Sequence, residues 1–416
     1  MRSLQAAWVG AVVASAMSWA APALARERAA APSKDRTVVA RCDGGFLETV
    51  GGHAVLHVAG TPYEMGFQHG RLLREHVHAV VRFLLDEKAK EMTAEVAGME
   101  LMSPQLVIQG IQAVQQPFLP EWYDEELRGL ADGSGLPLAD IRTVNFIPEL
   151  FHCSGFAVSG AATGNEHTYH GRVLDYGCDW KLQEHPVVIV ARPAGKIPFV
   201  NVGYAGFIGS VTGMNAERIS AGEMGGAGLG KWLGVPMAIL MREVLQGADT
   251  LAEAVAVFRD NPRTCEYYYV LADGKTGEAV ALEAGADEFR AVEMGAACDR
   301  LPHAVEDAVL LSADDRYELL VKRTRAAHGR IDAEAALALM DRPVSMTSNL
   351  HNVLFETSTG RFWVAHASPD GQPAAEQAYL GFDLRELLAH EPGPDAKELP
   401  GPEPAAVGTT VAAGVD

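Results

Sequence analysis

The residues best suited to catalysis by their type and spacing are Cys153, Arg172 and Asp175. Cys153 begins the apolar segment CSGFAVSG, and Arg172 and Asp175 lie in the next such segment, YHGRVLDY. The turn-rich stretch between the two segments predicts a β-hairpin, which would bring a thiol, a guanidinium and a carboxylate to one end of a sheet. This trio suits a nucleophilic cysteine, because the thiolate is the reactive form and a nearby positive charge lowers its pKa. A buried core thiol or half of a disulfide is the alternative that the residues alone leave open.

The elements that must position this trio follow from the hydrophobic pattern. Thr61, Pro62 and Glu64 form a capping-box pattern with proline at the first helical position, which predicts a long amphipathic helix. Further helices are predicted at 103–115, 123–131, 236–246, 250–258, 313–327 and 332–340. Strands are predicted at 153–159, 168–174, 187–191, 199–202, 267–271, 278–283, 289–292 and 362–365. Helices come first and strands mixed with helices follow, an order that indicates antiparallel sheet with helices packed outside it.

Both ends of the chain differ from its body. Residues 1–25 carry one charge, an apolar stretch and a small-residue site ending at Ala25, which together predict a secretory signal peptide and a periplasmic or secreted protein. Residues 391–416 are rich in Pro, Ala and Gly, and we expect a disordered tail there. No later stretch is long and apolar enough to predict a membrane span.

Composition narrows the function classes. The chain is 48% hydrophobic and 21% charged, which is ordinary for a globular protein, and its formal net charge is −20. Such an excess of negative charge disfavours nucleic acid as a partner. The five cysteines form no C-x-x-C pair, and the histidines show no H-E-x-x-H frame, so we expect neither a metal nor another cofactor. An odd number of cysteines in an exported protein leaves at least one thiol unpaired.

Several motifs resemble, in the same order, those of the isopenicillin N acyltransferase-like family of N-terminal nucleophile (Ntn) hydrolases. They are GTPYEMGFQHGRLL, the strand at Cys153 with GRVLDY after it, GSVTGMNAERISAGEMGG and EYYYVLADGKTGEAVALEA. The resemblance covers roughly residues 60–384. It implies an α+β fold, a four-layer αββα sandwich of two antiparallel sheets with helices outside. It also implies self-cleavage before a cysteine, whose freed α-amino group then serves as the general base.

Carried onto this chain, the resemblance implies cleavage of the His152–Cys153 bond. Residues 26–152 would then form a helical N-terminal chain, and 153–390 the catalytic chain that stays associated with it. Asp175 would bind the new α-amino group, and Arg172 would orient or polarise the thiolate. For the oxyanion site, the backbone N–H of Met224 or Gly225 is one expected donor.

The second oxyanion donor is less well defined by the motifs. Related enzymes carry an asparagine directly after a threonine, just before a helix. The corresponding segment of this chain, LPHAVEDAVLLSADDRYE, contains no asparagine. Asn349 is the expected substitute, and Asn352 and Ser312 are alternatives.

The reaction expected from the resemblance is hydrolysis of a linear amide in a small-molecule N-acyl substrate, through an acyl-enzyme on Cys153. Acyl transfer to an amine acceptor and peptidase activity are alternatives. Water is the more available acceptor outside the cytoplasm, which favours hydrolysis. A catalytically inactive relative with a binding or structural role is the alternative from a different class.

Overall fold

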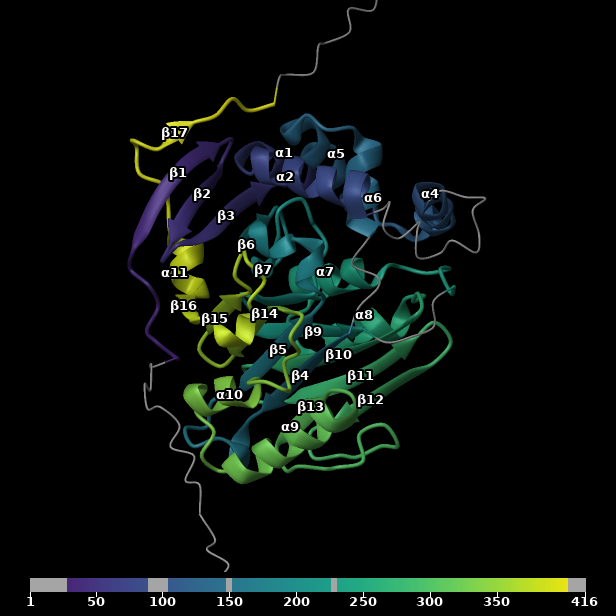
Figure 1. Cartoon of the computed structure of the whole chain (residues 1–416), viewed down its shortest axis with the longest axis vertical. Helices are drawn as coiled ribbons and strands as arrows, with labels where there is room; N and C mark the ends of the chain where they lie inside the picture. Colours follow the sequence, from purple (N-terminus) through teal and green to yellow (C-terminus); the bar gives the residue numbers. More distant parts are fainter. Residues whose placement is uncertain (1–27, 89–103, 147–151, 226–229, 403–416) are drawn as a thin grey trace, which may run out of the picture.

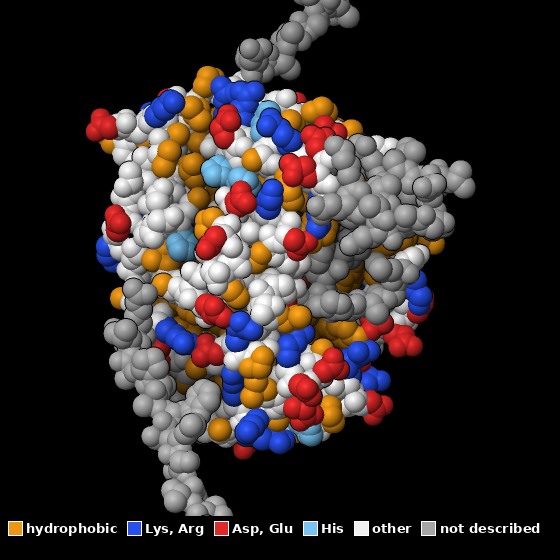
Figure 2. Space-filling model, in the orientation of Figure 1, with side chains coloured by type: hydrophobic (Ala, Val, Ile, Leu, Met, Phe, Trp, Pro, Cys, Tyr) orange, Lys and Arg blue, Asp and Glu red, His pale blue; other side chains and the backbone are white. Residues whose placement is uncertain are grey.

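The computed structural model describes residues 28–88, 104–146, 152–225 and 230–402. The predicted signal peptide, residues 1–25, and the end of the predicted tail lie outside the described residues. No helix among the described residues is long and apolar enough to cross a membrane. Acidic and basic side chains are interspersed over the face of the molecule seen in Figure 2.

Two β-sheets form the centre of the described structure. The larger sheet has the strand order β12-β11-β10-β9-β8-β7-β6-β3-β2-β1-β17, and the smaller sheet has the order β13-β4-β5-β14-β15-β16. All neighbouring strands are antiparallel except the pairs β3–β6 and β1–β17. The strands of the larger sheet are β1 (Arg36–Cys42), β2 (Gly45–Val50), β3 (His53–Gly60), β6 (Pro186–Pro193), β7 (Phe199–Tyr204), β8 (Thr212–Asn215), β9 (Ile219–Gly225), β10 (Glu266–Asp273), β11 (Ala279–Gly285), β12 (Phe289–Glu293) and β17 (Lys397–Glu398). Those of the smaller sheet are β4 (His152–Val158), β5 (Tyr169–Asp175), β13 (Ala308–Leu311), β14 (Asn349–Glu356), β15 (Arg361–His366) and β16 (Leu380–Asp383).

Helices cover the outer faces of both sheets. On the larger sheet α7 packs on β8 and β9, α8 on β10 and β11, and α1 on β3, while α9 and α10 pack on the smaller sheet. Figure 1 shows α1, α2, α5 and α6 grouped at one end of the molecule and α9 and α10 at the other. The helices are α1 (Pro62–Leu72), α2 (Arg74–Arg82), α4 (Pro104–Gln115), α5 (Glu121–Ser134), α6 (Leu138–Phe146), α7 (Met237–Gly247), α8 (Leu251–Asp260), α9 (Asp314–Ala327), α10 (Ala333–Leu339) and α11 (Leu384–Ala389). The predicted fold class, an α+β sandwich of two sheets with helices outside, is confirmed.

Strand alternation explains why two buried layers form. In β6, Val188 and Val190 belong to the cluster between the two sheets, where they join Val353 and Phe355 of β14. Ile189, with the opposite orientation, belongs to the cluster that includes the helices. Because side chains alternate across a strand, a continuous apolar run such as Val187–Ala191 fits a strand that is covered on both faces.

Several predicted elements are found, including the first helix. Thr61 accepts a hydrogen bond from the Glu64 N–H, and the Glu64 carboxylate accepts one from the Thr61 N–H, so the capping box is formed. The prediction that helices come first was wrong, because β1, β2 and β3 precede α1. Tight turns at Asp43–Gly44 and Gly51–Gly52, with positive φ at all four residues, connect these short strands. The segment 26–152 is therefore not purely helical.

Part of the segment 391–416, predicted to be a disordered tail, is ordered. Within it, Lys397–Glu398 forms β17, which pairs in parallel with Ala40 and Arg41 of β1. The Leu399 N–H also donates to the Arg41 carbonyl. A short edge strand needs only a few hydrogen bonds and little apolar bulk, so composition did not reveal it. Residues 403–416 lie outside the described residues.

Candidate active site

The predicted hairpin positions Cys153 beside Asp175. β4 and β5 pair antiparallel, with Cys153 opposite Leu174, His152 opposite Asp175 and Gly155 opposite Arg172. Cys153 is thus the second residue of its strand, and Asp175 is the last residue of the neighbouring strand. The bond predicted to be cut, His152–Cys153, lies at this same sheet end.

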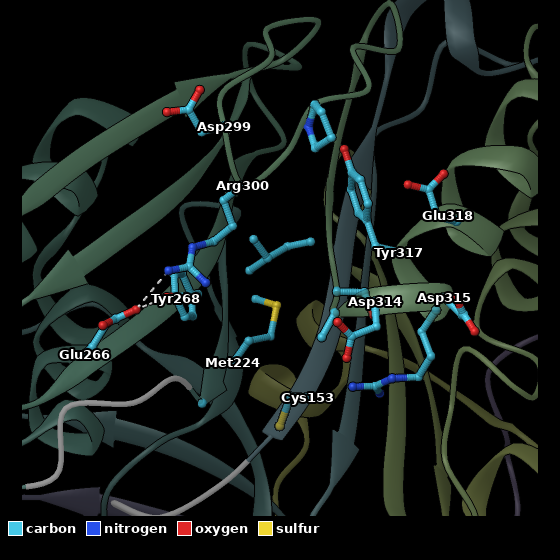
Figure 3. Close-up of a pocket in the computed structure, with 16 residues that line it drawn as sticks. Cys153, Met224, Glu266, Tyr268, Asp299, Arg300, Asp314, Asp315, Tyr317 and Glu318 are labelled. Atoms are coloured by element: carbon cyan, nitrogen blue, oxygen red, sulfur yellow. Dashed lines mark hydrogen bonds and ion pairs between the residues drawn. The ribbon is translucent and has the colours of Figure 1, made fainter.

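Cys153 forms part of the wall of a cavity of about 800 Å³. Only 6% of the surface of Cys153 is exposed, so the thiol lies deep in the cavity wall. Figure 3 shows Cys153 next to Met224, with Tyr268 and Arg300 on one side and Tyr317 of α9 on the other. The cavity is therefore built by β4, by the ends of β9 and β10, and by the start of α9, and its size suits a small-molecule ligand.

Burial dominates the electrostatics of the thiol. It raises the pKa of Cys153 to about 11, and negative charge on Glu223 and Asp175 acts in the same direction. The Arg172 guanidinium and a hydrogen bond from the Asp175 backbone lower the pKa, but they do not outweigh burial. The expected activation by Arg172 alone is thus insufficient in the continuous chain, and the thiol needs a base to become a nucleophile.

Arg172 is held rigidly between the sheets. Its side chain is fully buried, its Nη2 lies 3.4 Å from Glu223 Oε2 of β9, and its Nε donates to the Val211 carbonyl at 3.3 Å. A Cβ placed on Gly222 would lie 2.8 Å from Arg172 Cδ, so glycine is required where β9 crosses this side chain. A buried arginine paired in this way provides a fixed positive charge behind the thiol.

Asp175 is paired with an arginine from a distant helix. Its Oδ2 lies 2.7 Å from Arg316 Nη1 of α9, and its Oδ1 accepts a hydrogen bond from the Met346 N–H at 2.9 Å. Burial raises the pKa of the Asp175 carboxyl, whereas the Met346 N–H and the two arginines, Arg316 and Arg172, lower it. The carboxylate is therefore fixed close to the start of β4, where a new chain end would lie.

The two backbone oxyanion candidates, Met224 and Gly225, also form part of the cavity wall. So does Ser312, which exchanges a hydrogen bond of 2.7 Å with Ser154, the residue after Cys153. Met224 and Gly225 lie in β9 of the larger sheet, whereas Ser312 directly follows β13 of the smaller sheet.

Asn349 is placed differently from the other candidates. It lies at the start of β14 opposite Asp175, is fully buried, and is not among the residues that line the cavity. Its Nδ2 lies 2.9 Å from Asn352 Oδ1 and 3.1 Å from the Leu174 carbonyl, and its Oδ1 accepts from the Ala375 N–H at 2.9 Å. In this geometry Asn349 ties β14 to β5, and Ser312 is the better placed side-chain donor.

Sequence reasoning did not identify Glu223 or Arg316 as members of the site. Glu223 is a charged residue within the otherwise uncharged strand β9, ISAGEMG, and this signal was available in the sequence. Arg316 gave no comparable signal, because arginine is common on amphipathic helices. The five cysteines, including Cys178, are free thiols in the structure.

Comparisons with known proteins give distant relatives, and no family model matches the chain. The chain is 24% identical over 392 residues to Protein dcd1B of Dictyostelium discoideum, which covers 82% of this chain and 75% of that protein. It is 28% identical over 187 residues to the N-acylethanolamine-hydrolyzing acid amidase of Cavia porcellus, covering 42% and 52%. It is 26% identical over 194 residues to the acid ceramidase of Rattus norvegicus, covering 39% and 48%.

These matches span about half the length of the two named enzymes. Among solved structures, an N-acylethanolamine-hydrolyzing acid amidase ortholog of Caenorhabditis elegans aligns with a TM-score of 0.40 and 17% identity, over 50% of this chain and 93% of that one. The chain is thus similar, at low identity, to an acid amidase and an acid ceramidase. The narrower resemblance to the isopenicillin N acyltransferase-like family stays a prediction from its motifs.

Proposed function

We propose that this protein is an exported cysteine amide hydrolase that cuts its own His152–Cys153 bond and then uses Cys153 as nucleophile and its new α-amino group as general base. The observation that carries the proposal is the position of Cys153, buried beside Asp175 and Arg172 and open to an 800 Å³ cavity. Similarity to an acid amidase and an acid ceramidase supports an amide as the bond cleaved.

The proposed reaction begins when the Cys153 sulfur adds to the carbonyl carbon of an N-acyl amide while the α-amino group takes the thiol proton. An α-amino group has an ordinary pKa of about 8, so it is a competent base near neutral pH, whereas the buried thiol alone stays protonated. Met224 or Gly225 N–H, with Ser312, would stabilise the oxyanion. Collapse of the intermediate breaks the C–N bond, and the amine leaves with the proton from the α-ammonium. Water then attacks the thioester, releasing the carboxylic acid and the free thiol.

Both pieces of the proposed cleavage contribute to one sheet. β3, which precedes the cut, pairs with β6, which follows it, over Val55–Gly60 and Val188–Pro193. Six residue pairs in a buried ladder, together with the packing of α1 on β3, favour continued association of the two chains after cleavage.

Intact-mass measurement of the purified protein tests self-cleavage. We expect two chains separated at Cys153 in the wild type, one uncut chain in Cys153→Ala, and normal cleavage in the matched control Cys178→Ala. Cleavage at the same bond in Cys153→Ala would refute self-processing. A wild-type chain that stays whole, with a thiol at 153 that resists alkylation, would refute the enzyme proposal.

A further inference from the structure

Acidic side chains outnumber basic side chains in the lining of the Cys153 cavity. Five carboxylates and two guanidiniums are among the side chains that line it: Glu266, Asp299, Asp314, Asp315 and Glu318 against Arg300 and Arg316. Figure 3 shows Glu266 and Asp299 on one side of the cavity, with Met224 between them and Cys153, and Asp314 and Asp315 on the other side, where Asp314 lies nearer to Cys153 than Tyr317 does. Acidic side chains therefore border the cavity on both sides of the thiol.

The two arginines do not neutralise the free carboxylates. Arg300 lies 3.2 Å from Glu266 and 3.3 Å from Glu283, and its guanidinium lies 4.7 Å above the Tyr268 ring. Arg316 forms an ion pair with the buried Asp175. Each cation is therefore already matched by at least one carboxylate.

Three carboxylates remain without a cationic partner among the ion pairs of the described residues: Asp299, Asp314 and Asp315. Glu318, in contrast, lies 3.0 Å from His303. Asp314 and Asp315 begin α9, whose N-terminus offsets about half a unit of their charge. The cavity therefore carries a net negative charge above the buried thiol.

We propose, on the basis of the proposed function, that the amine half of the substrate carries a second, protonated amino group, so that the enzyme takes mono-acylated diamines in preference to amides of amino acids. The acyl group stays bound to sulfur after the first step, whereas the amine is released into the cavity, which these carboxylates border. A cation there is attracted and an anion such as a glycine carboxylate is repelled.

Three amides with one common acyl chain test the proposal, with ethylenediamine, ethanolamine or glycine as the amine half. The three amine halves are nearly equal in size and differ in charge. We expect kcat/KM to fall from the diamine to the ethanolamine to the glycine amide, by about tenfold or more between the extremes, and the ratio to shrink as salt is raised. Equal values, or preference for the glycine amide, would overturn the proposal.

A variant locates the effect in the cavity. Asp314→Asn combined with Asp315→Asn should reduce the diamine-to-glycine ratio several-fold, whereas Glu75→Gln on α2, an exposed carboxylate away from the cavity, should leave it unchanged. An equal response to both variants would show that net charge alone sets the ratio. A series with the charge at the far end of the acyl chain should show a smaller ratio, and a larger one there would overturn the assignment to the amine half.

Loss of the proposed function is distinguishable from loss of this inference. If all three amides are inert, the amidase proposal fails, and the cavity can still be examined by the reaction of the Cys153 thiol with cationic and anionic methanethiosulfonates of equal size. The cationic reagent should react about tenfold faster or more, relative to the same pair acting on a small free thiol. Equal relative rates would overturn the inference independently of catalysis.

Discussion

Replacing Arg316 by methionine removes the only side-chain ion pair described for the Asp175 carboxylate. The two atoms lie 2.7 Å apart, and the Asp175 side chain is fully buried. Breaking such a pair from one side costs about 3–5 kcal/mol, because the remaining charge is left uncompensated. One bond from the Met346 N–H persists, so we expect a loss of about 3–4 kcal/mol near neutral pH.

The loss should depend on pH, because Asp175 can take up a proton instead. In Arg316→Met the folded-state pKa of Asp175 rises further above its unfolded value, so the folded protein binds more protons than the unfolded chain between the two values. Stability in the variant therefore falls as pH rises through that window, by up to about 1.4 kcal/mol per pH unit. The penalty should be small near pH 5 and large near pH 7.

Urea unfolding at several pH values measures the effect, in a Cys153→Ala background so that the chain stays in one piece. Arg325→Met is the matched control, since Arg325 lies on the same helix and donates to the Ala304 carbonyl at 3.1 Å. Adding Asp175→Asn to Arg316→Met should recover most of the loss. A penalty under about 1 kcal/mol near pH 7, or one equal to that of the control at every pH, would refute the role assigned to this pair.

Three further outcomes are expected. In Gly222→Ala the new Cβ would lie 2.8 Å from Arg172 Cδ, so we expect a loss of about 1–3 kcal/mol in urea unfolding and slower self-cleavage. Gly203→Ala is the control, because a Cβ there would have no heavy atom within 4 Å, and it should change neither quantity. Equal behaviour of the two variants would contradict the close approach of β9 to Arg172. Burial lowers the pKa of His366 to about 3 while the unfolded value stays near 6.5, so this histidine should reduce stability as pH drops below about 6.5, by about 2 kcal/mol at pH 5. His366→Phe should therefore lose about 2 kcal/mol less than the wild type between pH 7 and pH 5 in urea unfolding, while other buried histidines such as His170 keep their own contribution. Ser312→Ala should lower kcat by about tenfold or more if its hydroxyl stabilises the oxyanion, and an unchanged kcat would leave that task to the backbone donors.

Much of the local structure was predictable because its causes are local. The Thr61 capping box and the β4–β5 hairpin depend on residues close together in the chain, and the structure contains both. β1, β2 and β3 were missed because charged and polar residues interrupt short strands whose pairing depends on two tight turns. The edge pairing of Lys397–Glu398 was missed because composition does not reveal a single backbone ladder of two residue pairs.

The sequence by itself predicted that Cys153, Arg172 and Asp175 meet at one sheet end, because two apolar segments flank a turn-rich stretch, and the strand register in the structure agrees with this prediction. Only the tertiary structure decided what surrounds them. Glu223 reaches Arg172 because the two sheets pack face to face, and Arg316 reaches Asp175 from a helix 141 residues away. The environment of the thiol depends on burial and on charges supplied by distant segments, and no local pattern encodes either quantity.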